Sequence, residues 1–129
     1  MKYSDDQKYW DRYWDENKNK KTFFNSLVAL AREYYFAKYF AKFIAKNYDI
    51  KNKTVCEIGA GSGLTLAYLK KWGANKCTGI DYSEEAIEMA ESSNKECEFI
   101  YGDAFNLSNI SDKNFDLVYS LGFLEHYNK

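Results

Sequence analysis

Histidine occurs once in the 129 residues, cysteine three times and proline not at all. The chain has one histidine and three widely separated cysteines, which is not the ligand pattern of a zinc site, so we expect no metal site. Cys56, Cys77 and Cys97 are odd in number and widely separated, and two of them fall within expected strands. We therefore expect reduced thiols in the core. The lack of proline needs no explanation beyond genome composition.

The chain also lacks an excess of charge of either sign. Its formal net charge is −1, so it has no basic footprint for a nucleic-acid partner, although a local patch that reads RNA stays open. The first residues are polar and acidic, and no apolar run approaches the length of a membrane span. We expect no membrane contact and a cytoplasmic location.

What the chain does contain is enough apolar sequence for one globular domain. Apolar residues make up 46% and charged residues 29% of the 129 positions, which is typical of a folded soluble protein. We expect two parts, an N-terminal aromatic helix with a polar linker over 1–21 and an α/β domain over 22–129.

The segment TVCEIGAGSG (54–63) organises the domain. An apolar, β-branched run ends in Glu57 and breaks into Gly59, Gly61 and Gly63, which predicts a buried strand that enters a tight turn. The next residues, 64–73, have apolar positions at helical spacing and a final glycine that suits a C-terminal cap. Strand, glycine turn and helix together form a site where a ligand lies against free backbone N–H groups.

Two helices are expected before this segment. A short one carries the aromatic residues Tyr9, Trp10, Tyr13 and Trp14, which either pack on the domain's own core or form a lid over a ligand pocket. A long one spans about 23–47. Its expected apolar face consists of Phe24, Leu27, Val28, Ala31, Tyr35, Ala41, Ile44 and Ala45. Lysines at 38, 42 and 46 form a second stripe, which we interpret as a solvated face.

After the glycine turn, expected strands and helices alternate. Strands are expected at 77–81, 98–101 and 115–120, a helix at 84–92 capped by Ser83, and a loop with one helical turn at 105–114. This alternation predicts a doubly wound, Rossmann-like parallel sheet of about four strands. Right-handed crossovers bring the strand ends to one edge, where ligands bind.

Three acids fall at this edge: Glu57, Asp81 and Asp103. Asp81 lies 20 residues after Gly61, the spacing at which such folds place an acid on ribose hydroxyls. Glu57 would repel a pyrophosphate on the glycine turn, but it would attract an ammonium or sulfonium group. Position 64 is Leu, so the dinucleotide pattern Gly-x-Gly-x-x-Gly is not met. We therefore disfavour a nicotinamide-dependent oxidoreductase.

Four segments resemble the successive motifs of class I S-adenosylmethionine-dependent methyltransferases, in the same order and spacing. They are VCEIGAGSG (55–63), GIDYS (79–83), GDA (102–104) and FDLVYS (115–120), and the resemblance covers about 53–126. It implies S-adenosylmethionine as cofactor and S-adenosylhomocysteine as product. The positions that the resemblance assigns to the cofactor are Glu57, Gly59, Ala60, Gly61, Gly63, Asp81, Tyr82, Asp103, Ala104, Ser120 and Leu121.

The resemblance also implies a role for most of these residues. The methionine part would lie on the glycine turn with its amino group near Glu57, and the ribose would bind Asp81. Tyr82 would flank the adenine, and Asp103 would accept from its amino group, with Ala104 offering a backbone contact. The main chain of Ser120 and Leu121 would approach the methionine end. Plain packing for Tyr82 and a turn acid for Asp103 are the alternatives.

His126 is the sole histidine and follows the last expected strand. It titrates near neutrality, so it is a candidate catalytic base or acceptor contact, with Glu125 beside it; an ordinary structural residue is the alternative. SLGFLEH (120–126) resembles small-molecule methyltransferases and lacks the Asn/Asp-Pro-Pro-Tyr signature of enzymes that act on amide or base nitrogens. We therefore expect a small-molecule acceptor.

A complete domain of this family has more strands than the four expected here. We expect the chain to be the cofactor-binding part of a longer enzyme, with an exposed sheet edge that favours self-association. A module that only binds S-adenosylmethionine, S-adenosylhomocysteine or a partner chain stays open as the alternative.

Overall fold

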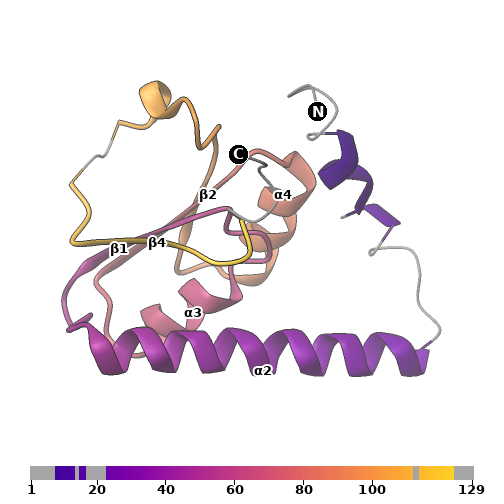
Figure 1. Ribbon diagram of the computed structural model, residues 1–129, viewed down its shortest axis with the longest axis horizontal. Helices are drawn as coiled ribbons and strands as arrows, with labels where there is room; N and C mark the ends of the chain where they lie inside the picture. Colours follow the sequence, from indigo (N-terminus) through magenta and orange to yellow (C-terminus); the bar gives the residue numbers. More distant parts are fainter. Residues whose placement is uncertain (1–7, 14, 17–22, 112–113, 124–129) are drawn as a thin grey trace.

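The computed structural model describes residues 8–13, 15–16, 23–111 and 114–123, and within them four parallel strands form one sheet (Figure 1). The strands are β1 (Thr54–Ile58), β2 (Lys76–Asp81), β3 (Glu98–Tyr101) and β4 (Leu117–Ser120), in the spatial order β3-β2-β1-β4. The parallel Rossmann-like sheet expected from the sequence is confirmed. Because the chain extends in both directions from β1, a crevice is expected where the carboxyl ends of β1 and β4 meet.

Helices connect or precede the strands much as the sequence predicts. Residues 8–13 are helical, α2 spans Phe23–Asn47, α3 Leu64–Lys71 and α4 Glu84–Ser93, and a single 3-10 turn, η1, spans Leu107–Asn109. Ser83 caps α4, since its Oγ accepts from the backbone N–H of Ala86 at 3.3 Å. Gly73 follows α3 with a φ of 114°, the conformation that a C-terminal cap requires.

The main core lies between the sheet and the helices. Val55, Cys77 and Phe99 project from three neighbouring strands to the same side, where they meet Leu66 and Leu69 of α3. This alternation follows from the two-residue period of a strand. All three cysteines are free; Cys56 and Cys77 are buried and Cys97 is partly exposed, as expected for reduced core thiols.

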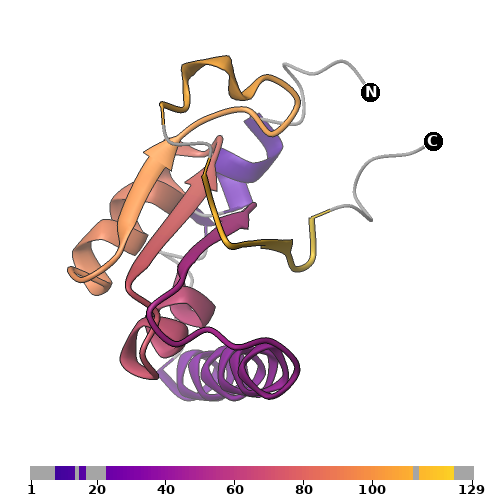
Figure 2. The same cartoon turned by 90° about the vertical axis from the view of Figure 1, so that its left-hand side faces the viewer.

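The opposite face of the sheet is covered much less completely (Figure 2). Cys56, Ile80 and Ile110 form a smaller cluster there, beneath the segment that carries η1. Val118 of β4 lies on the same side of the sheet as Cys56 and is 55% exposed. Among the described residues, β4 pairs on one side only, with β1. The expected exposed edge is therefore present in the described chain.

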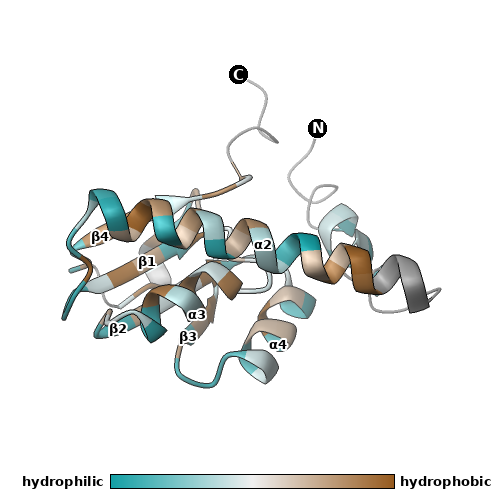
Figure 3. Ribbon diagram, turned by 90° about the horizontal axis from the view of Figure 1, so that it is seen from below, coloured by the Kyte–Doolittle hydropathy of each residue, from teal (hydrophilic) through white to brown (hydrophobic). Residues whose placement is uncertain are grey.

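The predicted apolar face of α2 is correct near the C-terminal end of the helix, at Ala41 and Ile44, and wrong nearer its N-terminal end. The residues that bury themselves are Ala37, Ala41 and Ile44, whereas Leu27 and Val28 are each 55% exposed. At about 1.5 Å per residue, the 25 residues of α2 extend far beyond the 8 residues of α3, so its first turns project past that neighbour (Figures 1 and 3). Two alanines and one isoleucine therefore form the buried surface of α2.

Two further details concern α2 and β4. Lys38, Lys42 and Lys46 are exposed, so the lysine stripe is a solvated face, and none of the helices in the described part of the chain is long and apolar enough to cross a membrane. Strand β4 begins at Leu117, two residues later than expected. The carboxylate of Asp116 accepts from the backbone N–H of Thr54 at 2.7 Å and from its hydroxyl at 2.9 Å, which fixes the start of β4 against β1.

Candidate functional site

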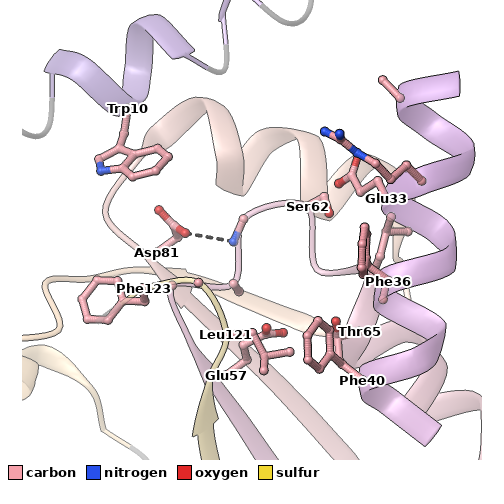
Figure 4. A pocket seen from close by; sticks show the side chains of 18 of the residues that line it. Trp10, Glu33, Phe36, Phe40, Glu57, Ser62, Thr65, Asp81, Leu121 and Phe123 are labelled. Atoms are coloured by element: carbon pink, nitrogen blue, oxygen red, sulfur yellow. Dashed lines mark hydrogen bonds between the residues drawn. The ribbon is translucent and has the colours of Figure 1, made fainter. Parts of the chain in front are cut away.

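A cavity of about 440 Å³ opens at the carboxyl ends of β1, β2 and β4 (Figure 4). Five segments that are far apart in the sequence build it: the N-terminal helical segment, one side of α2, the glycine turn with the start of α3, the end of β2, and the residues after β4. Its described lining residues are Trp10, Ala29, Arg32, Glu33, Phe36, Ala37, Phe40, Glu57, Gly59, Ala60, Gly61, Ser62, Leu64, Thr65, Asp81, Tyr82, Leu121, Gly122 and Phe123.

The glycine turn shapes one wall of the cavity. Gly59 has a φ of 73°, and a Cβ there would lie 2.9 Å from the ring of Phe123. Gly63 has a φ of 69°, and a Cβ there would lie 2.4 Å from the ring of Phe99. Both positions therefore require glycine, because neither the backbone conformation nor the space admits a side chain. Gly63 faces the core and does not line the cavity.

Asp81 fastens the glycine turn to the end of β2. Its Oδ2 accepts from the backbone N–H of Gly61 at 2.9 Å, and its Oδ1 accepts from the backbone N–H of Ser83 at 3.0 Å. Burial raises the pKa of Asp81, while the hydrogen bonds from Gly61 and Ser83 act to lower it. Each carboxylate oxygen accepts more than one hydrogen bond, so Asp81 keeps acceptor capacity on the cavity side.

Glu57 is a carboxyl group near the floor of the cavity, and only 4% of the residue is exposed. Tyr119 donates from Oη to Glu57 Oε2 at 3.1 Å. Burial raises the pKa of Glu57 to about 8, against the opposing effect of the Tyr119 hydrogen bond, and the nearby Asp81 carboxylate raises it further. Burial together with Glu57 likewise raises the pKa of Tyr119. A cation bound beside Glu57 would favour its ionised form.

Trp10 reaches the cavity from the N-terminal helical segment (Figure 4). Its ring packs edge-on against Tyr9 and Tyr13, with ring centres 5.3 and 5.5 Å away. Burial and then the carboxylates of Glu85 and Glu84 raise the pKa of Asp11, which agrees with the position of this segment near the first turn of α4. Trp14 lies outside the described residues.

Sequence reasoning missed the contribution of α2. Arg32, Phe36 and Phe40 recur every four residues and line the cavity together with Glu33. Side chains at that spacing share one side of a helix. The signal was present in the sequence, but it was concealed in a 25-residue helix with aromatic residues on several sides.

The structure brings only some of the predicted site residues to the cavity. Those that line it are Glu57, Gly59, Ala60, Gly61, Asp81, Tyr82 and Leu121. Gly63, Asp103, Ala104 and Ser120 are not among the lining residues. Asp103 Oδ1 accepts from the backbone N–H of Phe105 at 2.8 Å, an arrangement that closes a turn. His126 and Glu125 lie outside the described residues.

No group of three or more metal-ligating side chains occurs within the residues described. The functional groups that the described residues bring to the cavity are carboxylates, one guanidinium, hydroxyls, backbone N–H groups and aromatic rings. Such a site suits a ligand that combines cationic groups, hydroxyls and a planar ring.

Comparison with known proteins agrees with this site. A family model described as a methyltransferase domain matches residues 56–129. A putative protein N5-glutamine methyltransferase of Methanocaldococcus jannaschii is 36% identical over 74 residues, which cover 54% of this chain and 36% of that protein. Demethylmenaquinone methyltransferase of Thermotoga maritima is 34% identical over 71 residues, which cover 54% of this chain and 31% of that protein. The chain thus spans about a third of the length of these two relatives.

Among solved structures, magnesium protoporphyrin IX methyltransferase from Synechocystis PCC 6803 with bound S-adenosylhomocysteine has a TM-score of 0.74. The match covers 98% of this chain and 61% of that one at 18% identity, so it shows a shared fold. The family model covers more than half of the 129 residues, and the four strands form a parallel sheet of the predicted Rossmann-like kind. This chain belongs to the class I S-adenosylmethionine-dependent methyltransferases.

Proposed function

We propose that the cavity binds S-adenosylmethionine and that the chain is the cofactor-binding part, over 22–129, of a cytoplasmic methyltransferase, preceded by the aromatic segment and linker of 1–21. The observation that carries this proposal is the meeting of Glu57, the glycine turn and Asp81 around one cavity. These groups supply a carboxyl group, free backbone surface and a hydroxyl acceptor, which together match an aminoacyl nucleoside.

Each group has a defined task in this proposal. The methionine part lies on the turn at Gly59, Ala60 and Gly61, with its ammonium group near Glu57. Asp81 accepts from the ribose hydroxyls while it continues to hold the amide of Gly61. Tyr82 flanks the adenine.

Four other predicted contacts lie outside the lining of the cavity, and they remain predictions. They are the adenine contacts of Asp103 and Ala104, the main-chain contact of Ser120 and the support that Gly63 gives to the turn.

The bound cofactor supplies an activated methyl group that an acceptor nucleophile displaces in line. The protein's share is to hold the two reactants in line and to exclude water. Trp10, Leu121 and Phe123 surround the cavity with apolar surface, which favours water exclusion. His126 remains the proposed base for an acceptor that must lose a proton.

We propose a small molecule as the methyl acceptor. Two features support this choice. The segment from the end of β4 onward, Ser120 to Phe123, lacks the Asn/Asp-Pro-Pro-Tyr signature, and Phe36 and Phe40 add an aromatic wall to the cavity. Of the two relatives compared, one is named for a protein glutamine acceptor and the other for demethylmenaquinone. The alternative is a module that binds cofactor, product or a partner chain without catalysis.

Calorimetric titration with S-adenosylhomocysteine tests the proposal directly. We expect the wild-type chain to bind and Asp81→Ala to bind at least about tenfold more weakly, because hydrogen bonds to a charged group contribute about 1.5–3 kcal/mol. Asp103→Ala is the matched comparison, because the wild-type Asp103 carboxylate accepts from a backbone amide in a turn. This variant measures the proposed adenine contact separately. A folded wild-type chain that binds neither S-adenosylmethionine nor its product would refute cofactor binding.

Catalysis needs a separate experiment. We expect methyl transfer to small-molecule acceptors in a screen that uses the longest reading frame containing this chain. Cofactor binding without transfer to any acceptor would favour the non-catalytic alternative.

A further inference from the structure

Acidic side chains outnumber basic ones among the described residues that line the cavity. Among the described residues, three acids reach it, Glu33, Glu57 and Asp81, but only one cation does, Arg32. The lysines of α2 at positions 38, 42 and 46 are exposed and are not part of the lining. Among the described lining residues, an anionic group of a ligand has a single cationic side chain to meet, that of Arg32.

The fold holds Arg32 on the cavity side of α2. Phe36 and Phe40 follow it at intervals of four residues and line the same cavity, so all three share one side of the helix. Ala37 and Ala41 are buried against the core, which fixes the rotation of α2. The close-up shows that α2 faces Ser62 and the glycine turn across the cavity (Figure 4).

The guanidinium of Arg32 is available to a ligand. Within the part of the chain that the structure describes, Arg32 has no salt-bridge or hydrogen-bond partner. Its neighbour Glu33 also lines the cavity, but adjacent residues of a helix do not face each other. Arg32 is an exposed residue, and its planar guanidinium is suited to bidentate recognition of a carboxylate.

S-adenosylmethionine carries an ammonium, a sulfonium and one carboxylate. The acids of the cavity complement its two cations, and within the described lining the guanidinium of Arg32 is the group left for the carboxylate. We infer that Arg32 binds the carboxylate of the methionine part and thereby selects a complete aminoacyl nucleoside over nucleosides that lack this group. The inference rests on the proposed function, because it presupposes that the cofactor lies on the glycine turn.

A pair of ligands isolates this contact without any mutation. Decarboxylated S-adenosylmethionine keeps the adenosine, the sulfonium and the ammonium and lacks only the carboxylate. We expect the wild-type chain to bind S-adenosylmethionine about tenfold or more tightly than the decarboxylated compound. The difference should shrink as salt is added, since an exposed charge pair is screened.

Variants then assign the difference to Arg32. Arg32→Met should weaken S-adenosylmethionine binding about tenfold and leave the affinity for the decarboxylated compound within about twofold. Arg32→Lys keeps the charge without the fork, and it should fall between wild type and Arg32→Met. Lys38→Met removes the same charge from the solvated face of α2 and should change neither affinity.

The outcomes separate this inference from the proposed function. If the wild-type chain binds neither compound, the proposed function fails and the role of Arg32 fails with it. If wild type binds both compounds equally, or if Arg32→Met weakens both equally, cofactor binding stands and the carboxylate contact is overturned. Should Arg32→Met not fold by circular dichroism, the comparison of the two ligands on wild type and on Arg32→Lys still decides the question.

Discussion

Glu57 is a carboxyl group enclosed at the end of a central strand, and its pKa of about 8 lies far above the ordinary value of 4.5. A group whose pKa is raised by folding stabilises the fold fully below the ordinary value, and that stability is lost as the pH rises through the folded-state value. The free energy of unfolding of the wild-type chain should therefore fall between about pH 5 and pH 8.

Glu57→Gln should remove this dependence on pH. The glutamine side chain has the same shape and still accepts from Tyr119, so the variant should gain stability over wild type by up to about 1.4 kcal/mol per pH unit across that interval. Urea unfolding at several pH values measures the difference. Glu91→Gln, an exposed acid on α4, is the control and should follow wild type. Parallel curves for wild type and Glu57→Gln would contradict a raised pKa.

For single residues, the sequence predicted several members of the cavity but not the direction of every side chain. The positions of Glu57 and Asp81 followed from strand ends and spacing, which are local properties of the chain. That Gly63 serves the packing of Phe99, and that Asp103 closes a turn, depends on neighbours that come together only in three dimensions.

The N-terminal helical segment carries the aromatic cluster that was expected either to pack on the core or to form a lid over the cavity. Trp10 lines the cavity, whereas Tyr9 is 55% exposed; this arrangement supports a lid that closes with one residue. We expect Trp10→Ala to weaken the binding of S-adenosylhomocysteine about fivefold, the loss of an aromatic contact of about 1 kcal/mol.

Tyr9→Ala is the matched variant and should change that affinity by less than about twofold. Calorimetry on both variants, and on a chain without residues 1–20, measures the effect. Unchanged affinity in a folded chain that lacks this segment would reject the lid.

Prediction of the elements succeeded where periodicity is unambiguous. The strand at 98–101 and the capped helix after Ser83 have the expected bounds to within a residue. The face of α2 was predicted correctly at Ala41 and Ile44, which are buried. It was wrong at Leu27 and Val28, which are exposed, because hydropathy does not show that the first turns of α2 extend past α3. Close helix packing selects small residues by shape, which a hydropathy pattern does not encode.

The exposed edge of the sheet is expected to affect how whole molecules associate. Val118 is 55% exposed on β4, whose outer side is unpaired in the described chain. Unpaired strand edges with apolar side chains associate, so the 129-residue chain should self-associate with rising concentration.

Val118→Lys should shift the chain toward monomer in sedimentation velocity experiments, since a charge at an edge strand opposes pairing. Val28→Lys makes the same substitution at a site on α2 with the same 55% exposure and should leave the distribution unchanged. A wild-type chain that stays monomeric at every concentration, or equal effects of the two variants, would show that β4 does not mediate association.

The pairing of β1 with β4 also governs when the cavity forms. The contact between Thr54 and Asp116 spans 62 positions, and the lining extends from Trp10 to Phe123. Such a cavity does not exist in a partly folded chain, because closing so long a loop belongs to the slow, non-local steps of folding. A ligand can bind there only to fully folded molecules. Raising the ligand concentration should therefore raise the melting temperature of the whole chain rather than protect one segment.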